Sequence, residues 1–150
     1  MIAVIQRVTE ATVKINGKLE GQISNGLVVL LGIAEGDDKQ EVDWLSRKIA
    51  NMRLFSDENG IMNKSLIEVH AEILLISQFT LHASTKKGNR PSYLKAARPE
   101  LAIPLYEQMI SALNSQIPTE VKTGIFGANM QVSLNNDGPV TIIIDSKERK

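Results

Sequence analysis

The stretch "GLVVLLGIA", residues 26–34, decides more about the fold than any other part of the sequence. It is a continuous apolar run of strand length, without the apolar–polar alternation of a half-buried strand. Such a run predicts a central strand that is buried on both faces. It is also far too short to cross a bilayer, which takes about 20 residues.

The residues before this run predict a hairpin. Residues 1–15, "MIAVIQRVTEATVKI", are rich in β-branched side chains with partial alternation, which favours one or two strands. Asn16 and Gly17 form a dipeptide that strongly favours a tight turn between antiparallel strands. No charged leader followed by an apolar segment is visible at the start, so we expect a cytoplasmic protein.

Two segments predict helices. Residues 35–55 begin with two N-cap candidates, Asp37 and Asp38. Apolar side chains then recur at helical spacing, which predicts an amphipathic helix: Val42, Leu45, Ile49 and Met52. Residues 99–116 predict a second helix, in which Pro104 lies early enough to be absorbed in the first turns or to kink it.

The remaining segments predict strands and turns. Residues 71–81, "AEILLISQFTL", predict a second buried strand. Residues 119–126, 128–136 and 139–146 predict closing strands with turns between them. The charged tail "DSKERK", residues 145–150, is expected to be disordered.

The order of these elements defines the fold class. Strands, a helix, a strand, a helix and further strands do not follow the regular alternation of a doubly wound fold. We therefore expect a single α+β domain over residues 1–150, with a mostly antiparallel, barrel-like sheet and two main helices.

The composition argues against several kinds of enzyme. The chain has no cysteine, which excludes disulfides, thiolate chemistry and cysteine-based zinc sites. Its only histidines, His70 and His82, lack metal-ligand spacing and are expected to be surface or packing residues. No phosphate-binding glycine loop or serine nucleophile elbow is present. We expect no metal and no cofactor.

Charge is balanced over the chain but not along it. The 17 basic residues match the 17 acidic ones, so nothing draws the whole protein towards nucleic acid. Residues 73–99 nevertheless contain no acidic side chain and five basic ones: Lys86, Lys87, Arg90, Lys95 and Arg98. This block is either a local phosphate-binding face or a solvated loop and helix start.

Two short stretches are unusual for their positions. "SQFT", residues 77–80, puts polar groups at the end of a buried strand, where each needs a partner. Either the strand surfaces there, or it delivers donors into a pocket, with Thr80 as a possible nucleophile that has no evident base nearby. In "NNDGPVTIII", residues 135–144, Gly138 and Pro139 open an apolar strand, and taken alone they predict a tight turn.

Taken together, these motifs carry a resemblance. With "MIAVIQRVTEATV", "FSDENGIMN", "GNRPSY" and "TGIFGANMQVSL", they make the whole chain closely similar to the D-aminoacyl-tRNA deacylases. Tyr93 stands where that family has an aromatic, and Phe79 is the usual occupant of its motif position. The resemblance implies a cytoplasmic homodimer that acts on the 3′ end of aminoacyl-tRNA, with no cofactor, membrane or DNA partner.

The implied reaction is chiral proofreading in translation quality control. The enzyme would hydrolyse the ester of D-aminoacyl-tRNA, and of glycine mischarged on tRNA-Ala, by positioning the ester and stabilising its oxyanion. Four residues of the first motif would line the pocket, with the backbone of the last two binding the carbonyl: Ser77, Gln78, Phe79 and Thr80. Phe126 would pack on the terminal adenine, with Met130 nearby, although Phe126 alone could equally be a core aromatic.

The resemblance also assigns a role to the second motif. Gly138 and Pro139 would form a cis peptide bond and enter the partner subunit's site, where their carbonyls exclude L-amino acids. Arg7 would hold those carbonyls in orientation. Lys86, Lys87 and Arg90 would contact tRNA phosphates.

Three questions stay open at this level. The proton acceptor would be the ribose 2′-hydroxyl of the tRNA, with nucleophilic attack by Thr80 as the second option. A module that binds tRNA 3′ ends without hydrolysis would share every charge and aromatic feature. A hydrolase of small D-amino esters or peptides is a third alternative, and free D-aminoacyl esters would distinguish it.

Overall fold

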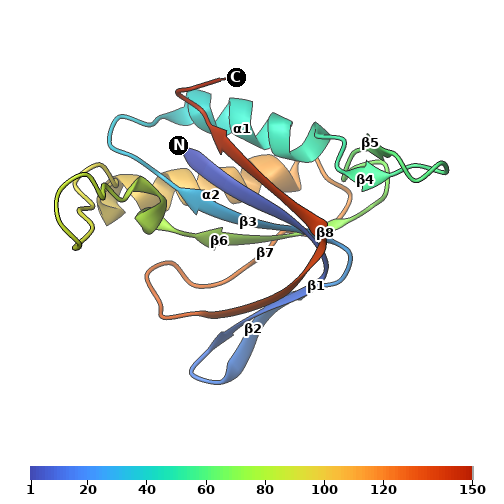
Figure 1. Ribbon diagram of the computed structural model, residues 1–150, viewed down its shortest axis with the longest axis horizontal. Coiled ribbons are helices and arrows are strands. Elements are labelled where there is room, and N and C mark those ends of the chain that lie inside the picture. The colour runs from blue at the N-terminus through green and yellow to red at the C-terminus, as the bar shows by residue number, and fades with distance from the viewer. Residues whose placement is uncertain (150) are drawn as a thin grey trace.

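The computed structural model describes residues 1–149. Its main sheet has the strand order β2-β1-β3-β6-β7, and β8 pairs with the other edge of β1 (Figure 1). The pairs of β1 with β2, β3 and β8 are antiparallel, whereas β6 runs parallel to β3 and β7. The strands are β1 (Ile2–Ile15), β2 (Lys18–Ile23), β3 (Gly26–Gly32), β6 (Glu72–Ser77), β7 (Lys122–Thr123) and β8 (Gln131–Asp145).

Both helices cover the same face of this sheet (Figure 1). They are α1 (Lys39–Asn51) and α2 (Pro99–Asn114), and Pro104 is absorbed inside α2. A small hairpin, β4 (Phe55–Ser56) and β5 (Met62–Lys64), follows α1. A 3₁₀ helix, η1 (Phe79–His82), follows β6. The α+β class, the mostly antiparallel sheet and the two helices are as predicted.

The central strand β3 is buried on both faces, as the apolar run predicts. Leu27, Val29 and Leu31 pack in the core beneath the helices. Val28 faces a second apolar cluster on the opposite side of the sheet. Leu27 is fully buried, so its truncation to alanine is expected to cost roughly 2–5 kcal/mol.

The strand β1 connects the two halves of the sheet. Its first half pairs with β3 and its second half with β2, while β8 follows its other edge. The predicted hairpin turn is confirmed, because Asn16 and Gly17 both have positive φ angles, of 51° and 76°.

The prediction of N-cap residues for α1 is half right. Asp38 is the N-cap, since its side chain accepts from the N–H of Gln40, over 2.7 Å, and Glu41 completes a capping box. Asp37 does not cap the helix. It is buried, and its carboxylate accepts a hydrogen bond from the α-amine of Met1.

The C-terminal third differs most from the prediction. Only Lys122–Thr123 of residues 119–126 are in a strand. The two strands expected over residues 128–136 and 139–146 are one strand, β8. Gly138 and Pro139 lie inside β8, at a point where the pairing with β1 shifts register. The strand accommodates them as an irregularity in the pairing and does not turn there.

The charged tail is not disordered over the residues that the structure describes. Ser146 is buried, and Lys147 forms an ion pair with Glu41. The guanidinium of Arg149 lies 4.6 Å from the ring centroid of Trp44. Polar and cation–π partners on α1 and at the N-terminus therefore fix the tail, and Lys150 lies outside the described residues. No helix within residues 1–149 has the length and apolar content to span a membrane.

Candidate active site

A cavity of about 280 Å³ lies where β6 ends, against the loop that follows β7. It brings together five of the residues that the sequence analysis named for the pocket: Ser77, Gln78, Phe79, Phe126 and Met130. Larger hollows of about 550 and 530 Å³ lie between α1 and α2 and beside Trp44. None of the predicted site residues lines them.

The end of β6 gives the cavity its polar wall. The strand is buried up to Ile76, and the chain then turns into η1. The N–H of Gln78 donates to the carbonyl of Leu31 on β3, over 2.8 Å, which ties this turn to the sheet. Its side-chain Nε2 donates to Oγ1 of Thr80, over 2.6 Å. The hydroxyl of Thr80 is thus held by an amide, which cannot act as its base.

The first turn of η1 leaves backbone donors free. Within residues 1–149, the N–H groups of Phe79 and Thr80 have no hydrogen-bond acceptor. Unpaired N–H groups are a general property of a helix start, because no preceding turn supplies their carbonyls. Phe79 lines the cavity, whereas Thr80, the next residue of η1, does not. A free N–H at the cavity wall is suited to stabilise a developing oxyanion.

The opposite wall comes from the loop between β7 and β8. The ring of Phe126 packs against Tyr106 of α2, with centroids 5.9 Å apart. The Tyr106 hydroxyl donates to the carbonyl of Leu75, over 2.9 Å, and burial raises its pKa to about 12. This neutral, anchored phenol fixes one side of Phe126.

At Gly124, a Cβ would collide with the sulfur of Met130, so glycine there lets that side chain approach the backbone.

Two aromatic rings stand at the outer rim. Phe79, 53% exposed, meets Tyr93 edge to face with centroids 5.1 Å apart. The contact joins η1 to the loop that carries the basic residues. Both residues stand out in the sequence, but their contact does not, because no short-range pattern connects positions 79 and 93.

The cavity lining contains no titratable side chain. His82 lies on η1 with its Nε2 buried and without a partner within residues 1–149, and His70 is exposed in a turn. Neither lines the cavity. The site can therefore donate hydrogen bonds and stack on a planar ring, but its lining offers no general base.

Gly138 and Pro139 do not line the cavity of their own chain. They are exposed on β8, and the peptide bond between them is cis. Gly138 has a φ of 133°, and a Cβ there would lie 2.9 Å from a methyl group of Val140. An L-residue at position 138 would thus be strained and crowded.

Arg7 lies beside this pair, one residue away from the expected contact. Its Nε donates to the carbonyl of Asp137, over 3.1 Å, and lies 3.5 Å from a carboxylate oxygen of the same residue. Its Nη1 donates to the carbonyl of Leu54, over 2.6 Å. The guanidinium therefore supports the backbone that leads into Gly138.

The basic side chains form an exposed loop directly after η1. Two hydrogen bonds between the backbones of Ser84 and Ser92, of 2.7 and 2.9 Å, close its base. Lys86, Lys87 and Arg90 are exposed, and none forms an ion pair within residues 1–149. The loop thus presents positive charge to solvent next to η1.

Comparison with known proteins is consistent across sequence and structure. The family model for D-Tyr-tRNA(Tyr) deacylase matches residues 4–145. The chain is 61% identical to the D-aminoacyl-tRNA deacylase of Cytophaga hutchinsonii and 58% identical to that of Bacteroides fragilis, in each case over the full length of both chains.

Two solved structures share the fold. One, titled "c-Myc DNA Unwinding Element Binding Protein", superposes with a TM-score of 0.91 at 43% identity, covering 97% of this chain and 98% of that one. A probable eukaryotic D-amino acid tRNA deacylase superposes with a TM-score of 0.79 at 15% identity, covering 95% of this chain and 97% of that one. At 15% identity the second likeness concerns the fold alone.

These findings identify the class first: the chain is a deacylase, which is a hydrolytic enzyme. More specifically, it belongs to the D-Tyr-tRNA(Tyr) deacylase family.

Proposed function

We propose that the protein hydrolyses the ester bond of D-aminoacyl-tRNA, releasing the D-amino acid and tRNA, and removes glycine mischarged on tRNA-Ala. The observation that supports this proposal is the cavity itself, which has an aromatic wall at Phe126, no titratable lining, and a free N–H on Phe79 followed by one on the adjacent Thr80. Family membership directs this chemistry to aminoacyl-tRNA. Residues 1–150 act as one deacylase domain, in the cytoplasm.

The substrate enters with its terminal adenine against Phe126 and Met130. The ester carbonyl then lies towards Phe79 and Thr80, whose N–H groups donate hydrogen bonds to its oxygen as negative charge develops there. Ser77 and Gln78 complete the polar wall. This placement uses groups that the fold already holds in position, so ordering the site costs little when the ester binds.

The cavity lining offers no general base, so we assign the role of proton acceptor to the substrate itself. Water attacks the carbonyl carbon, and the ribose 2′-hydroxyl takes part as the proton acceptor and relay. The bond between that carbon and the ribose 3′ oxygen breaks, and the 3′ oxygen takes the proton. Attack by Thr80 is the weaker alternative, because its hydroxyl is engaged by the amide of Gln78.

Chirality is read by a second copy of the chain. In the proposed homodimer, Gly138 and Pro139 of each subunit enter the other's cavity and occupy the space that the side chain of an L-residue needs. Their exposure on β8, away from the cavity of their own chain, supports this arrangement. Arg7 supports the backbone at Asp137, immediately before the pair.

The basic loop contributes affinity and no base specificity. Lys86, Lys87 and Arg90 contact tRNA phosphates, which would make binding depend on salt concentration. Their position just after η1 supports the assignment, since η1 borders the cavity. We propose no DNA and no membrane partner.

The test is release of amino acid from matched D-tyrosyl-tRNA and L-tyrosyl-tRNA by purified protein without added metal. The proposal requires rapid loss of the D-ester while the L-ester is spared. Equal hydrolysis of both would refute the chiral function. Binding of tRNA without hydrolysis of either would indicate a 3′-end binding module.

A second substrate tests the mechanism. Free D-tyrosine esters lack the neighbouring ribose hydroxyl, so they should be cleaved poorly compared with D-tyrosyl-tRNA. Efficient cleavage of free esters would indicate a general D-amino esterase. A DNA duplex added as competitor at physiological salt should not slow the reaction.

A further inference from the structure

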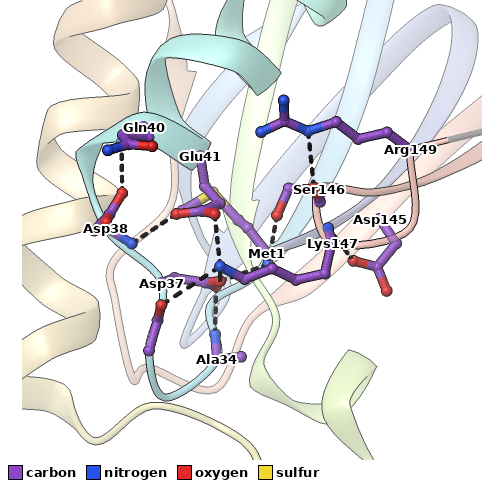
Figure 2. Close-up of polar contacts among 11 residues, drawn as sticks. Met1, Ala34, Asp37, Asp38, Gln40, Glu41, Asp145, Ser146, Lys147 and Arg149 are labelled. Carbon is purple, nitrogen blue, oxygen red and sulfur yellow. Dashed lines mark hydrogen bonds and ion pairs between the residues drawn. The ribbon is translucent and has the colours of Figure 1, made fainter.

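The α-amine of Met1 is buried in a network of polar contacts (Figure 2). It donates to Oδ1 of Asp37, over 2.8 Å, and to Oγ of Ser146, over 2.9 Å. The exposed fraction is 0% for both members of the ion pair. A charged amine at the start of a chain is usually solvated, so this pair is exceptional.

The carboxylate of Asp37 has few alternatives to this partner. Its other oxygen, Oδ2, accepts from the N–H of Ala34, over 2.8 Å, which fixes the side chain. Lys147 is the only other cation near it within residues 1–149, at 3.8 Å, and that side chain is 52% exposed. Without the α-amine, a buried carboxylate would keep one distant, solvated partner.

The network around the α-amine joins Met1 and the segment around Ser146 to each other and to α1. The carbonyl of Met1 accepts from the N–H of Ser146, over 2.9 Å, next to the pairing of Ile2 with Asp145. Lys147 bonds Glu41 on the first turn of α1, over 2.6 Å. Figure 2 shows these groups converging from three separate segments.

Acylation or extension of the α-amine would remove its positive charge and add bulk at a buried position. When the ammonium is acylated, one N–H proton is replaced by a bond to carbon and a second is released, which leaves a neutral amide with one N–H. A preceding residue does the same through a peptide bond. Met1 is 1% exposed, so either group would have to be placed among buried side chains or displace them.

We propose that the free α-amine of Met1 is a modification-sensitive site on which folding depends. In a chain that begins at Met1, an N-formyl or N-acetyl group, or any N-terminal extension, destabilises the fold by leaving the buried Asp37 with only the more distant Lys147 as a counter-charge. Once folded, the amine is shielded from acylating reagents. None of these residues lines the candidate active site, so the effect is on stability and not on chemistry.

The test compares one chain before and after a single peptide-bond cleavage. A short extension is joined directly to Met1 and removed by a protease that cuts immediately before it. The extended form should melt roughly 10 °C lower at equal protein concentration, and cleavage should restore the melting temperature. A difference below about 2 °C would overturn the proposal.

Two neighbouring carboxylates provide matched variants. In Asp37→Asn the counter-charge is no longer needed, so the extension should lower the melting temperature by less than half as much as in the wild type. In Asp38→Asn, which keeps a good N-cap, the extension should act fully. Equal effects in both variants would show a general burden of the extension and overturn the proposal.

A labelling experiment covers the case in which the extended chain does not fold. The native protein is treated with an N-hydroxysuccinimide ester of acetate, and acetylation is measured by mass spectrometry. The α-amine of Met1 should react at least roughly tenfold more slowly than in the urea-unfolded chain, because it must wait for local opening. Reaction as fast as that of the exposed Lys18 would overturn the proposal.

Discussion

Arg7 on β1 donates a hydrogen bond to the backbone carbonyl of Asp137 on β8, over 3.1 Å, across a separation of 130 residues. The same guanidinium donates to the carbonyl of Leu54, over 2.6 Å. The Arg7 side chain thus connects the backbone immediately before Gly138 with the segment after α1. A planar fork with fixed donors suits two carbonyls at once, which a lysine ammonium on a flexible stem does not.

Arg7→Lys is therefore expected to impair chirality control while the fold is kept. Losing one hydrogen bond from a charged donor costs about 1.5–3 kcal/mol, which corresponds to roughly a 10- to 150-fold lower ratio of the D-ester rate to the L-ester rate. Single-turnover deacylation of D- and L-tyrosyl-tRNA measures it. Arg47→Lys, an exposed position on α1, is the matched control and should change neither rate. If Arg7→Lys hydrolyses both esters at wild-type rates, Arg7 has no role in chirality control.

Thr80→Ala is expected to keep more than roughly a tenth of the wild-type rate. The lost hydroxyl accepts from Gln78, but the backbone N–H groups that stabilise the oxyanion remain. The rate constant is measured with D-tyrosyl-tRNA at saturating enzyme. A fall of three orders of magnitude or more, in a variant with native circular dichroism, would make Thr80 the nucleophile.

Phe126→Ala is expected to weaken binding of the tRNA 3′ end and leave the chemical step largely intact. Stacking of a base on an aromatic side chain contributes roughly 1–3 kcal/mol, so KM should rise about 5- to 150-fold. Phe126→Trp should restore most of the affinity, because it restores a stacking face. The adjacent Ile125→Ala is the control, since Ile125 does not line the cavity. An unchanged KM for Phe126→Ala would leave Phe126 as a packing residue against Tyr106.

Charge reversal of Lys86 and Lys87 together should weaken binding of all tRNAs alike. Each lost phosphate contact is expected to reduce the slope of log K against log salt by roughly one. Affinity is measured for two unrelated tRNAs between low and physiological salt. The control reverses Lys14 and Lys18 on the β1–β2 hairpin, where the net charge changes equally. Binding of the wild type that does not depend on salt would contradict the assignment.

The pair of Glu41 and Lys147 should make stability depend on acid pH. The Lys147 ammonium hydrogen-bonds the carboxylate and lowers the pKa of Glu41 from 4.5 to about 2. A depressed carboxyl pKa stabilises the fold above the unfolded value, and this contribution is lost as pH falls from about 4.5 towards 2. Lys147→Gln should therefore lower the melting temperature at pH 7, and its difference from the wild type should shrink below pH 4.5.

A surface pair provides the comparison for that measurement. Lys39 and Asp43 form an exposed i,i+4 ion pair on α1. Lys39→Gln should change stability by less than about 0.5 kcal/mol at any pH. If Lys147→Gln shows the same small and pH-independent effect, the ion pair with Glu41 does not stabilise the fold.

Local patterns were sufficient for much of the fold. The apolar run at residues 26–34 predicted β3, because a strand buried on both faces has no polar positions to interrupt it. Asn16 and Gly17 predicted their turn, and Asp38 its helix cap, since in each case the backbone within a few residues determines the preference.

The candidate site could be predicted only in part. The motifs at residues 77–80 and around Phe126 pointed to one pocket through a family resemblance. That they line one cavity depends on the parallel pairing of β6 and β7, which brings the end of one strand beside the loop that follows the other. Pairing between distant segments leaves no signal in either segment alone.

The sequence by itself determined the central strand, the hairpin turn, both helices and the motifs of the site. Only the tertiary structure decided that Asp37 meets the α-amine of Met1 instead of capping α1, and that the tail to Arg149 is held. It also decided that β8 continues through Gly138. The physical reason is common to all three: each depends on contacts with a segment that lies elsewhere in the sequence, so no local pattern shows it. For the buried Asp37, burial also makes a charged or hydrogen-bonding partner obligatory.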